Sequence, residues 1–128
     1  MKIKEKLAGR RLFINSSADQ TLIGLFVNGE MIAQKLIEIR SELSQRLLIE
    51  IDQLIKDNNF QIESVSVFAG PGSYTGLRIG ITTANFIAWS LRVPIYEADA
   101  GGAVTNQKDY ILPVYLQAAH ITKPKLKL

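Results

Sequence analysis

The hydrophobic pattern divides the first part of the chain into three extended segments. Residues 11–15 (RLFIN) form a short apolar run, and two longer runs rich in β-branched and apolar side chains cover residues 21–27 and 31–39. Asn28 and Gly29 separate the last two runs. An Asn-Gly pair between such runs is a strong signal for a tight hairpin, so the pattern predicts three strands, the last two joined directly.

The hydrophobic period becomes helical over residues 41–57. Ser41 or Ser44 can cap the start of this helix, and Asn58 with Asn59 suits its end. Six apolar side chains fall on one helical face. They are Leu43, Leu47, Leu48, Ile51, Leu54 and Ile55.

The second half of the chain predicts a strand at 65–69, a helix at about 75–91, a strand at 94–98, a loop made of 100–102 with 105–109, and a last extended segment at 111–117. The order is therefore βββαβαβ: an antiparallel start, then two right-handed crossovers onto parallel strands. This is an α/β fold with a mixed sheet and helices. It resembles a single subdomain of the actin-like, or ASKHA (RNase H-like), fold.

Small residues recur every four positions in the second predicted helix, at Gly76, Gly80, Ala84 and Ala88. A glycine inside a helix costs about 1 kcal/mol relative to alanine. Close approach of a neighbouring backbone would compensate for that cost. The stripe therefore predicts a tightly packed face.

The same helix carries no charged residue between Arg78 and Arg92, so most of its faces should be covered. In a small domain one apolar face would be left in solvent, which indicates a partner. The alternative is that the C-terminal segment covers this face within the monomer. The residues concerned are Ile79, Phe86 and Trp89 or Ser90.

The turn before this helix is the most constrained stretch of the chain, because Gly70, Gly72 and Gly76 allow unusual backbone angles or close approach. Ser73 and Thr75 are suited to capping free N–H groups. A strand-to-helix turn can cradle a phosphate, but no lysine follows, and the spacing G-x-G-x-x-x-G is not the dinucleotide fingerprint. Phosphate binding, a purely structural turn and a partner-binding loop all stay open.

The segment GPGSYTGLRIG resembles the signature loop of the TsaB (YeaZ-like) family, and the resemblance covers about residues 11–100. It implies a non-catalytic scaffold subunit that supports a TsaD-type enzyme in the N6-threonylcarbamoyladenosine (t6A) modification of tRNA. It also implies docking through a bundle formed by two helices of each partner. The partner-binding residues implied are Leu47, Ile51, Leu54, Gly72, Ser73, Tyr74, Thr75, Gly76, Leu77, Arg78, Gly80, Ile81, Ala84, Phe86 and Ala88.

Other partners follow from the same resemblance. A TsaE-type ATPase can join such complexes, the docking surface can form a homodimer, and tRNA is reached indirectly or through basic tails. No cofactor is expected beyond ATP at an interface shared with the catalytic partner. The family has a second α/β subdomain for which this chain has no room, so we expect a shortened member.

Catalytic groups are scarce. The chain has no cysteine and one histidine, His120, so the histidine pair of a metallopeptidase cannot form. Asn15 stands where actin-like enzymes commonly have an aspartate, and an amide is a poorer ligand for hard metals, which disfavours an independent ATPase. The alternatives are a nucleotide-binding protein or small-molecule enzyme that uses the loop from Gly70 to Gly76, and a repurposed homodimeric module.

Charge is concentrated at both ends. Residues 1–11 hold five basic residues against one acidic, giving +4, and residues 120–128 hold three lysines and no acid. The tails can favour phosphate backbones or be solvated termini. We expect an extension at 1–10, an actin-like domain at 11–118 and a basic tail at 119–128. No apolar run approaches the ~20 residues of a membrane helix, so we expect a soluble, cytoplasmic protein without a signal peptide.

Overall fold

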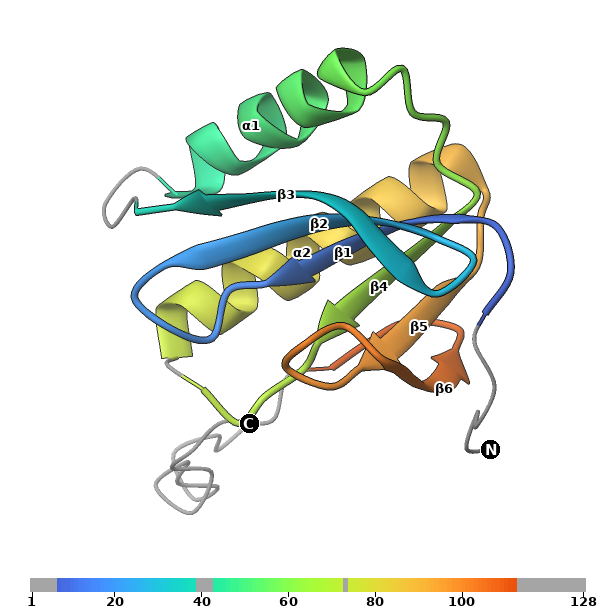
Figure 1. Ribbon diagram of the computed structural model, residues 1–128. Coiled ribbons are helices and arrows are strands. Elements are labelled where there is room, and N and C mark those ends of the chain that lie inside the picture. Colours follow the sequence, from blue (N-terminus) through green and yellow to red (C-terminus); the bar gives the residue numbers. More distant parts are fainter. Residues whose placement is uncertain (1–6, 39–42, 73, 113–128) are drawn as a thin grey trace.

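The computed structural model describes residues 7–38, 43–72 and 74–112 (Figure 1). Within these residues, six strands form one mixed sheet in the order β3-β2-β1-β4-β5-β6. The elements are β1 (Arg10–Asn15), β2 (Thr21–Val27), β3 (Glu30–Ile37), α1 (Leu43–Asp57), β4 (Ser64–Phe68), α2 (Tyr74–Leu91), β5 (Ile95–Ala98) and β6 (Val104–Lys108).

The antiparallel half of the sheet has the predicted hairpin. β2 pairs with β1 on one side and β3 on the other. Asn28 and Gly29 have φ values of 51° and 84°, the left-handed conformation that a two-residue hairpin turn requires. The prediction of a direct β2–β3 connection is therefore confirmed.

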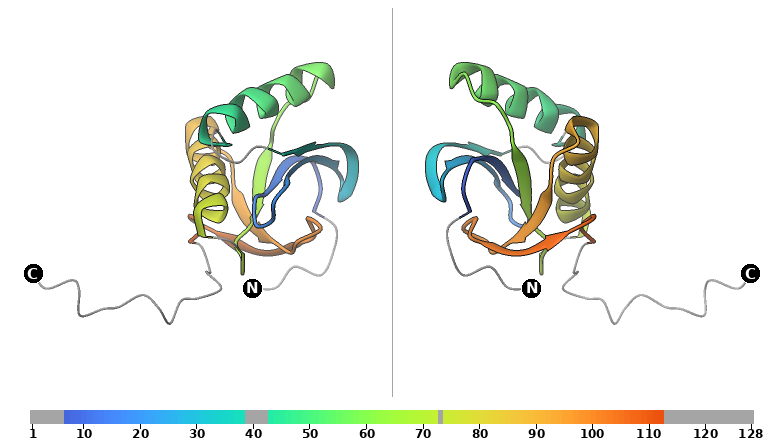
Figure 2. Two further views of the ribbon diagram at one scale, coloured as in Figure 1. Left: turned by 90° about the vertical axis from the view of Figure 1, so that its left-hand side faces the viewer. Right: turned by 90° about the vertical axis from the view of Figure 1, so that its right-hand side faces the viewer.

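The parallel half places β4 beside β1 and β5 beside β4, with α1 and α2 as the connections. Both helices lie on the same face of the sheet (Figure 2). One continuous apolar core fills the space between that face and the helices. Its fully buried members from the sheet are Leu12, Ile14, Ile23, Leu25, Val65 and Val67, and those from the helices are Leu47, Leu77 and Ala84.

The opposite face of the sheet carries a smaller cluster around a buried cation. The rings of Phe13 and Phe26 pack edge-to-face with centroids 6.0 Å apart, and the guanidinium of Arg11 lies 4.3 Å from the Phe26 centroid. Arg11 donates to Ser66 Oγ at 2.5 Å and to the carbonyl of Gly102 at 3.1 Å. Burial lowers the pKa of Arg11 to about 10. This side chain therefore connects β1 and β4 to the turn before β6.

The strand β6 corrects the sequence prediction. Residues 105–109 were expected to form a loop with 100–102, but Val104–Lys108 pairs antiparallel with β5. Its sequence, VTNQK, contains one apolar residue and has no buried position, so hydrophobic alternation could not reveal it. The strand forms through backbone pairing with β5, whereas residues 100–102 do form a turn. Most of the extended segment predicted at 111–117 lies outside the described residues.

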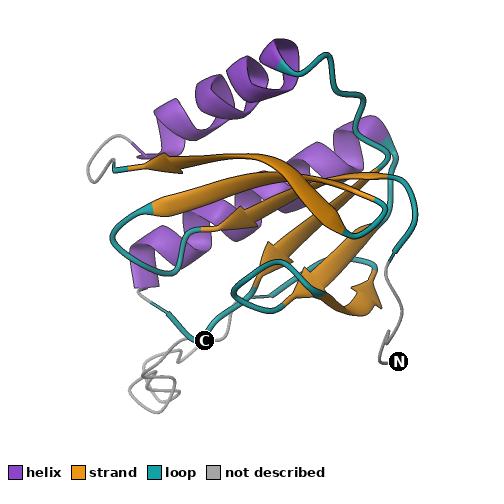
Figure 3. Cartoon of the chain, viewed as in Figure 1, coloured by secondary structure: helices purple, strands orange, loops and turns teal. Residues whose placement is uncertain are grey.

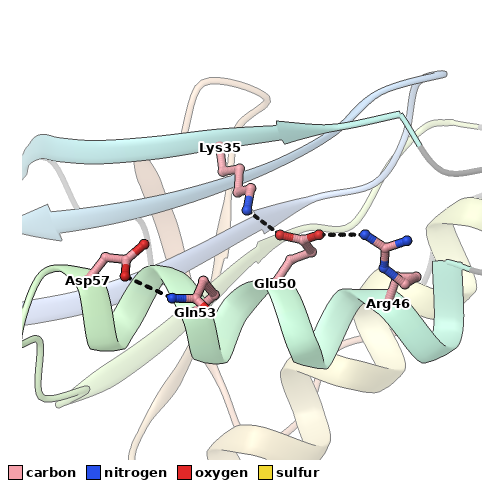
Figure 4. Close-up of polar contacts among 5 residues, drawn as sticks. All are labelled: Lys35, Arg46, Glu50, Gln53 and Asp57. Atoms are coloured by element: carbon pink, nitrogen blue, oxygen red, sulfur yellow. Dashed lines mark hydrogen bonds and ion pairs between the residues drawn. The ribbon is translucent and has the colours of Figure 1, made fainter.

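Polar contacts fix α1 over the sheet. Glu50 pairs with Lys35 of β3 and with Arg46 one turn earlier in the helix, the latter at 2.9 Å (Figure 4). The contact with Lys35, followed by that with Arg46, holds the pKa of Glu50 below its usual value. Asn59 ends the helix with φ 46°, as predicted. Ser41 lies outside the described residues, and Ser44 lies within the helix rather than before it.

No helix in the described part of the chain is long and apolar enough to cross a membrane.

Candidate functional site

The glycine turn leads from β4 into α2 and packs against the loop that follows β1 (Figure 3). Gly70 has φ 112°, and the Gly70–Pro71 peptide bond is cis. A Cβ on Gly72 would lie 2.6 Å from Cβ of Ser17 and 3.0 Å from its Cα. Glycine is required at position 72 because another segment of this chain occupies the space.

Asn15 joins two loops at the same end of the sheet. Its Oδ1 accepts hydrogen bonds from the backbone N–H of Ser17 at 3.0 Å and from Ser17 Oγ at 2.7 Å. Its Nδ2 donates to the carbonyl of Ala100 at 2.9 Å. A carboxylate could not make this last contact, because it has no N–H to donate. Asparagine therefore has a structural function here that the sequence did not reveal.

The small-residue stripe of α2 faces the sheet. Gly80, Ala84 and Ala88 are buried, and a Cβ on Gly80 would lie 2.0 Å from Ser16 Oγ. Ser16 is itself buried and donates to the carbonyl of Gly76 at 2.6 Å. The predicted tight packing is present at Gly80, but the expectation of a neighbouring backbone is wrong there, because the nearest atoms belong to the side chains of Ser16 and Ile14.

An apolar groove of about 630 Å³ runs between the outer sides of α1 and α2. Leu48 of α1 is 43% exposed and Phe86 of α2 is 54% exposed, and Ile79 lies half-buried between the two helices. Polar side chains complete the rim of the groove. They are Ser44, Thr75, Arg78, Thr82 and Thr83.

The partner-binding residues predicted from the sequence fall into four groups. Thr75, Arg78 and Phe86 line the groove, while Ser73 and the side chain of Tyr74 lie outside the described parts. Gly76 is half-buried. The remaining nine are buried within the subunit, and their role toward a partner stays a prediction. These nine are Leu47, Ile51, Leu54, Gly72, Leu77, Gly80, Ile81, Ala84 and Ala88.

Sequence reasoning did not assign Leu48 or Thr82 to the partner-binding set, although both line the groove. A signal for Thr82 was present, because positions 75, 79, 82 and 86 follow one helical stripe on the outer side of α2. Leu48 was expected to share the apolar face of α1 with the core residues. The structure leaves it 43% exposed at the margin of that face.

The sheet order, with both crossover helices on one face, defines an α/β domain of the RNase H-like (ASKHA) class. The solved structure of YeaZ from Pseudomonas aeruginosa superposes with a TM-score of 0.64 at 22% identity, over 71% of this chain and 44% of that one. RuvC of T. thermophilus, solved with a Holliday junction substrate, superposes at 0.54 with 12% identity, over 71% of this chain and 64% of that one. At these identities the likeness concerns the fold alone.

The family model described as TsaD: tRNA N6-adenosine threonylcarbamoyltransferase matches residues 37–110, and the chain belongs to this family, as a TsaB/YeaZ-like member. The tRNA threonylcarbamoyladenosine biosynthesis protein TsaB of Bacillus subtilis (strain 168) is 36% identical over 87 residues. That alignment covers 66% of this chain and 38% of the relative. The chain thus spans less than half the length of either TsaB or YeaZ.

Proposed function

We propose that the chain is a non-catalytic subunit that supports a TsaD-type enzyme in the t6A modification of tRNA. It would bind the catalytic subunit, stabilise it and help to shape its active site. Residues 11–118 would correspond to the N-terminal domain of a TsaB protein, with basic segments at 1–10 and 119–128. Both the domain boundaries and the cytoplasmic location belong to the proposal.

The exposed groove between α1 and α2 is the observation that carries this proposal. Leu48, Ile79 and Phe86 form an apolar centre and polar side chains surround it, which is the composition of a protein-binding surface. Large apolar side chains left in solvent on two adjacent helices can be covered by helices of a partner. This agrees with the two-helix docking that the family resemblance implies.

The residues beneath the groove would act indirectly. Leu47, Leu77 and Ile81 are buried against the sheet, so they would set the spacing of α1 and α2 rather than touch the partner. The same groove could join two copies of this chain when the catalytic partner is missing. A TsaE-type ATPase and tRNA would then be reached through the assembled complex.

The strand-end loops support a scaffold more than a nucleotide-binding enzyme. The amide of Asn15 is engaged with Ser17 and Ala100, and Gly72 packs directly on Ser17. These contacts give Gly72 and Asn15 structural roles at this end of the sheet, which supports the scaffold over the nucleotide-binding alternative. Calorimetry with ATP and Mg²⁺ on the isolated chain separates the two functions, because micromolar binding without a partner would favour the nucleotide-binding alternative.

Reconstitution tests the proposed function. The TsaD-type protein of the same organism, its threonylcarbamoyl donor and unmodified tRNA would be incubated with and without this chain, and t6A measured by mass spectrometry of the digested tRNA. We expect no t6A from the chain alone and increased t6A when it is added to the enzyme. An enzyme whose output does not change on addition of the chain would contradict the proposal.

A further inference from the structure

A second concavity lies on the other side of α2, away from the α1–α2 groove. It has a volume of about 650 Å³ and is formed by the last turns of α2 and the segment after β6. The side chains that matter are Asn85, Trp89 and Arg92 from the helix end and Asp109 and Tyr110 from the segment. We call this concavity the Trp89 pocket.

The wall of the Trp89 pocket is held in place by hydrogen bonds and by burial. Asn85 donates from Nδ2 to the carbonyl of Ile111 and accepts at Oδ1 from its backbone N–H, both at 2.9 Å. The Ile111 side chain is 2% exposed and belongs to the main core. Tyr110 therefore lies between the end of β6, where Lys108 pairs with Ile95, and the anchored Ile111, although its own ring is 63% exposed.

Arg92 follows the last residue of α2 and places its guanidinium at the pocket. Its backbone has φ 57°, and the other non-glycine residues with positive φ in the described chain are Asn28 and Asn59. Asparagine tolerates this region, whereas a longer side chain is strained there, and glycine is usual just after a helix. Within the described residues, the Arg92 guanidinium makes no hydrogen bond or ion pair. The backbone angle belongs to the helix C-cap, which is closed by hydrogen bonds from the Arg92 N–H to the carbonyl of Trp89 at 3.3 Å and from the Val93 N–H to that of Ala88 at 3.0 Å. What remains for a ligand is the guanidinium at the pocket.

The exposed rings indicate what the cation would accompany. Trp89 is 78% exposed, the highest value among the large apolar side chains described. A tryptophan and a tyrosine beside an arginine provide stacking surfaces and a positive charge, the combination that binds unpaired nucleobases and their phosphates. The carboxylate of Asp109 can accept hydrogen bonds from the N–H groups of a base.

We propose that the Trp89 pocket binds an unpaired base of RNA, with Trp89 and Tyr110 stacking on the base and Arg92 contacting an adjacent phosphate. The charge of the chain suits a polyanion, since it is +3 overall and residues 113–128 contain three lysines and no acidic residue. The choice of tRNA as the natural source of that base rests on the proposed function. The composition and geometry of the pocket are independent of the proposed function.

Trp89 is the only tryptophan of the chain, so its fluorescence reports on the pocket directly. The full chain would be titrated with a 12-nucleotide unstructured RNA, with the same RNA as a duplex, with AMP and with an unmodified tRNA transcript. We expect quenching by the single strand and the tRNA, and at least tenfold weaker binding of the duplex and of AMP. No quenching by the single strand, or equal affinity for duplex or AMP, would overturn the assignment.

Two substitutions separate binding from stability. Tyr110→Ala and Arg92→Gly should each weaken binding of the single strand about tenfold, while Arg92→Gly leaves the melting temperature equal or higher because glycine fits the backbone angle. Lys56→Gln, which removes an exposed positive charge on α1, should leave the affinity within twofold. Unchanged affinity in both pocket variants, or an equal loss in Lys56→Gln, would show that diffuse charge alone binds RNA.

The RNA-binding result does not depend on docking to a TsaD-type subunit. The titration uses the chain alone, so its failure leaves the reconstitution of t6A synthesis intact. A change in Trp89 emission that depends on protein concentration without RNA would identify the pocket as a contact between copies of the chain, which would also refute the RNA assignment.

Discussion

Replacing Gly80 by alanine adds one methyl group where, among the glycines described, a Cβ would meet its neighbours most closely. The new Cβ would lie 2.0 Å from Ser16 Oγ, 2.8 Å from Ser16 Cβ and 3.3 Å from Cγ2 of Ile14. Distances below about 3 Å cannot persist, so either the helix or the loop after β1 must shift. Ser16 is 1% exposed and cannot move into solvent without leaving the carbonyl of Gly76.

Three contributions set the expected size of the effect. Overpacking costs about 1–3 kcal/mol, and loss of the Ser16–Gly76 hydrogen bond costs about 1 kcal/mol. Alanine recovers about 1 kcal/mol of helix propensity over glycine. The Gly80→Ala variant should therefore unfold with a free energy lower by about 2 kcal/mol, equivalent to a melting temperature lower by roughly 8 °C in a domain of this size.

Urea denaturation followed by circular dichroism measures this difference, and a double-mutant cycle identifies its origin. Ser16→Gly removes both atoms nearest the new methyl group, so the double variant should be more stable than the sum of the single effects by at least about 1 kcal/mol. Thr82→Ala, at an exposed position of the same helix, serves as control and should be neutral or slightly stabilising. A Gly80→Ala variant as stable as the parent, or strictly additive with Ser16→Gly, would refute the packing described here.

Three further outcomes are expected. Glu50→Gln should lower the free energy of unfolding by about 1 kcal/mol at pH 7. Because Lys35 lowers the pKa of Glu50 in the folded state, the stabilisation by Glu50 is complete above the ordinary carboxyl pKa and is lost as the pH falls through the lowered pKa. A stability difference between parent and variant that persists at pH 2 in urea titrations would contradict this origin. Asn85→Ala should lower the free energy of unfolding by about 1–3 kcal/mol, because it leaves the backbone N–H and carbonyl of Ile111 unpaired. The Ile111 amide should then exchange its hydrogen faster, and unchanged protection would show that Asn85 does not hold this segment. Arg92→Gly should raise the free energy of unfolding by about 1 kcal/mol through relief of the left-handed conformation, and thermal denaturation would detect a loss instead if the arginine were structurally required.

Local signals were sufficient for most of the fold. The Asn28–Gly29 turn, the helical period of α1 and the glycine turn before α2 each depend on residues close in sequence, and the structure has all three. β6 could not be predicted, because its polar sequence gains a strand conformation only from the neighbouring edge of β5. The hydrophobic pattern of a segment does not indicate long-range backbone pairing of this kind.

The candidate site shows a different limit. The four-residue period of Gly76, Gly80 and Ala84 correctly indicated a close contact, but periodicity cannot say whether the contact lies within the chain or across an interface. At Gly80 the contact lies within the chain, because the nearest side chain is that of Ser16, 64 positions earlier in the sequence. The exposed stripe with Phe86 lies on the opposite side of the helix, and only the placement of α1 beside it defines a groove.

The affinity of the chain for a TsaD-type subunit, compared between two variants, tests the docking surface most directly. Phe86 and Ile32 are each 54% exposed, but Phe86 lines the groove whereas Ile32 lies on the edge strand β3. Calorimetric titration should show that Phe86→Asp weakens binding at least a hundredfold, as expected for a central apolar contact, while Ile32→Asp binds like the parent chain. Full affinity in Phe86→Asp, or a comparable loss in Ile32→Asp, would contradict docking through the α1–α2 groove.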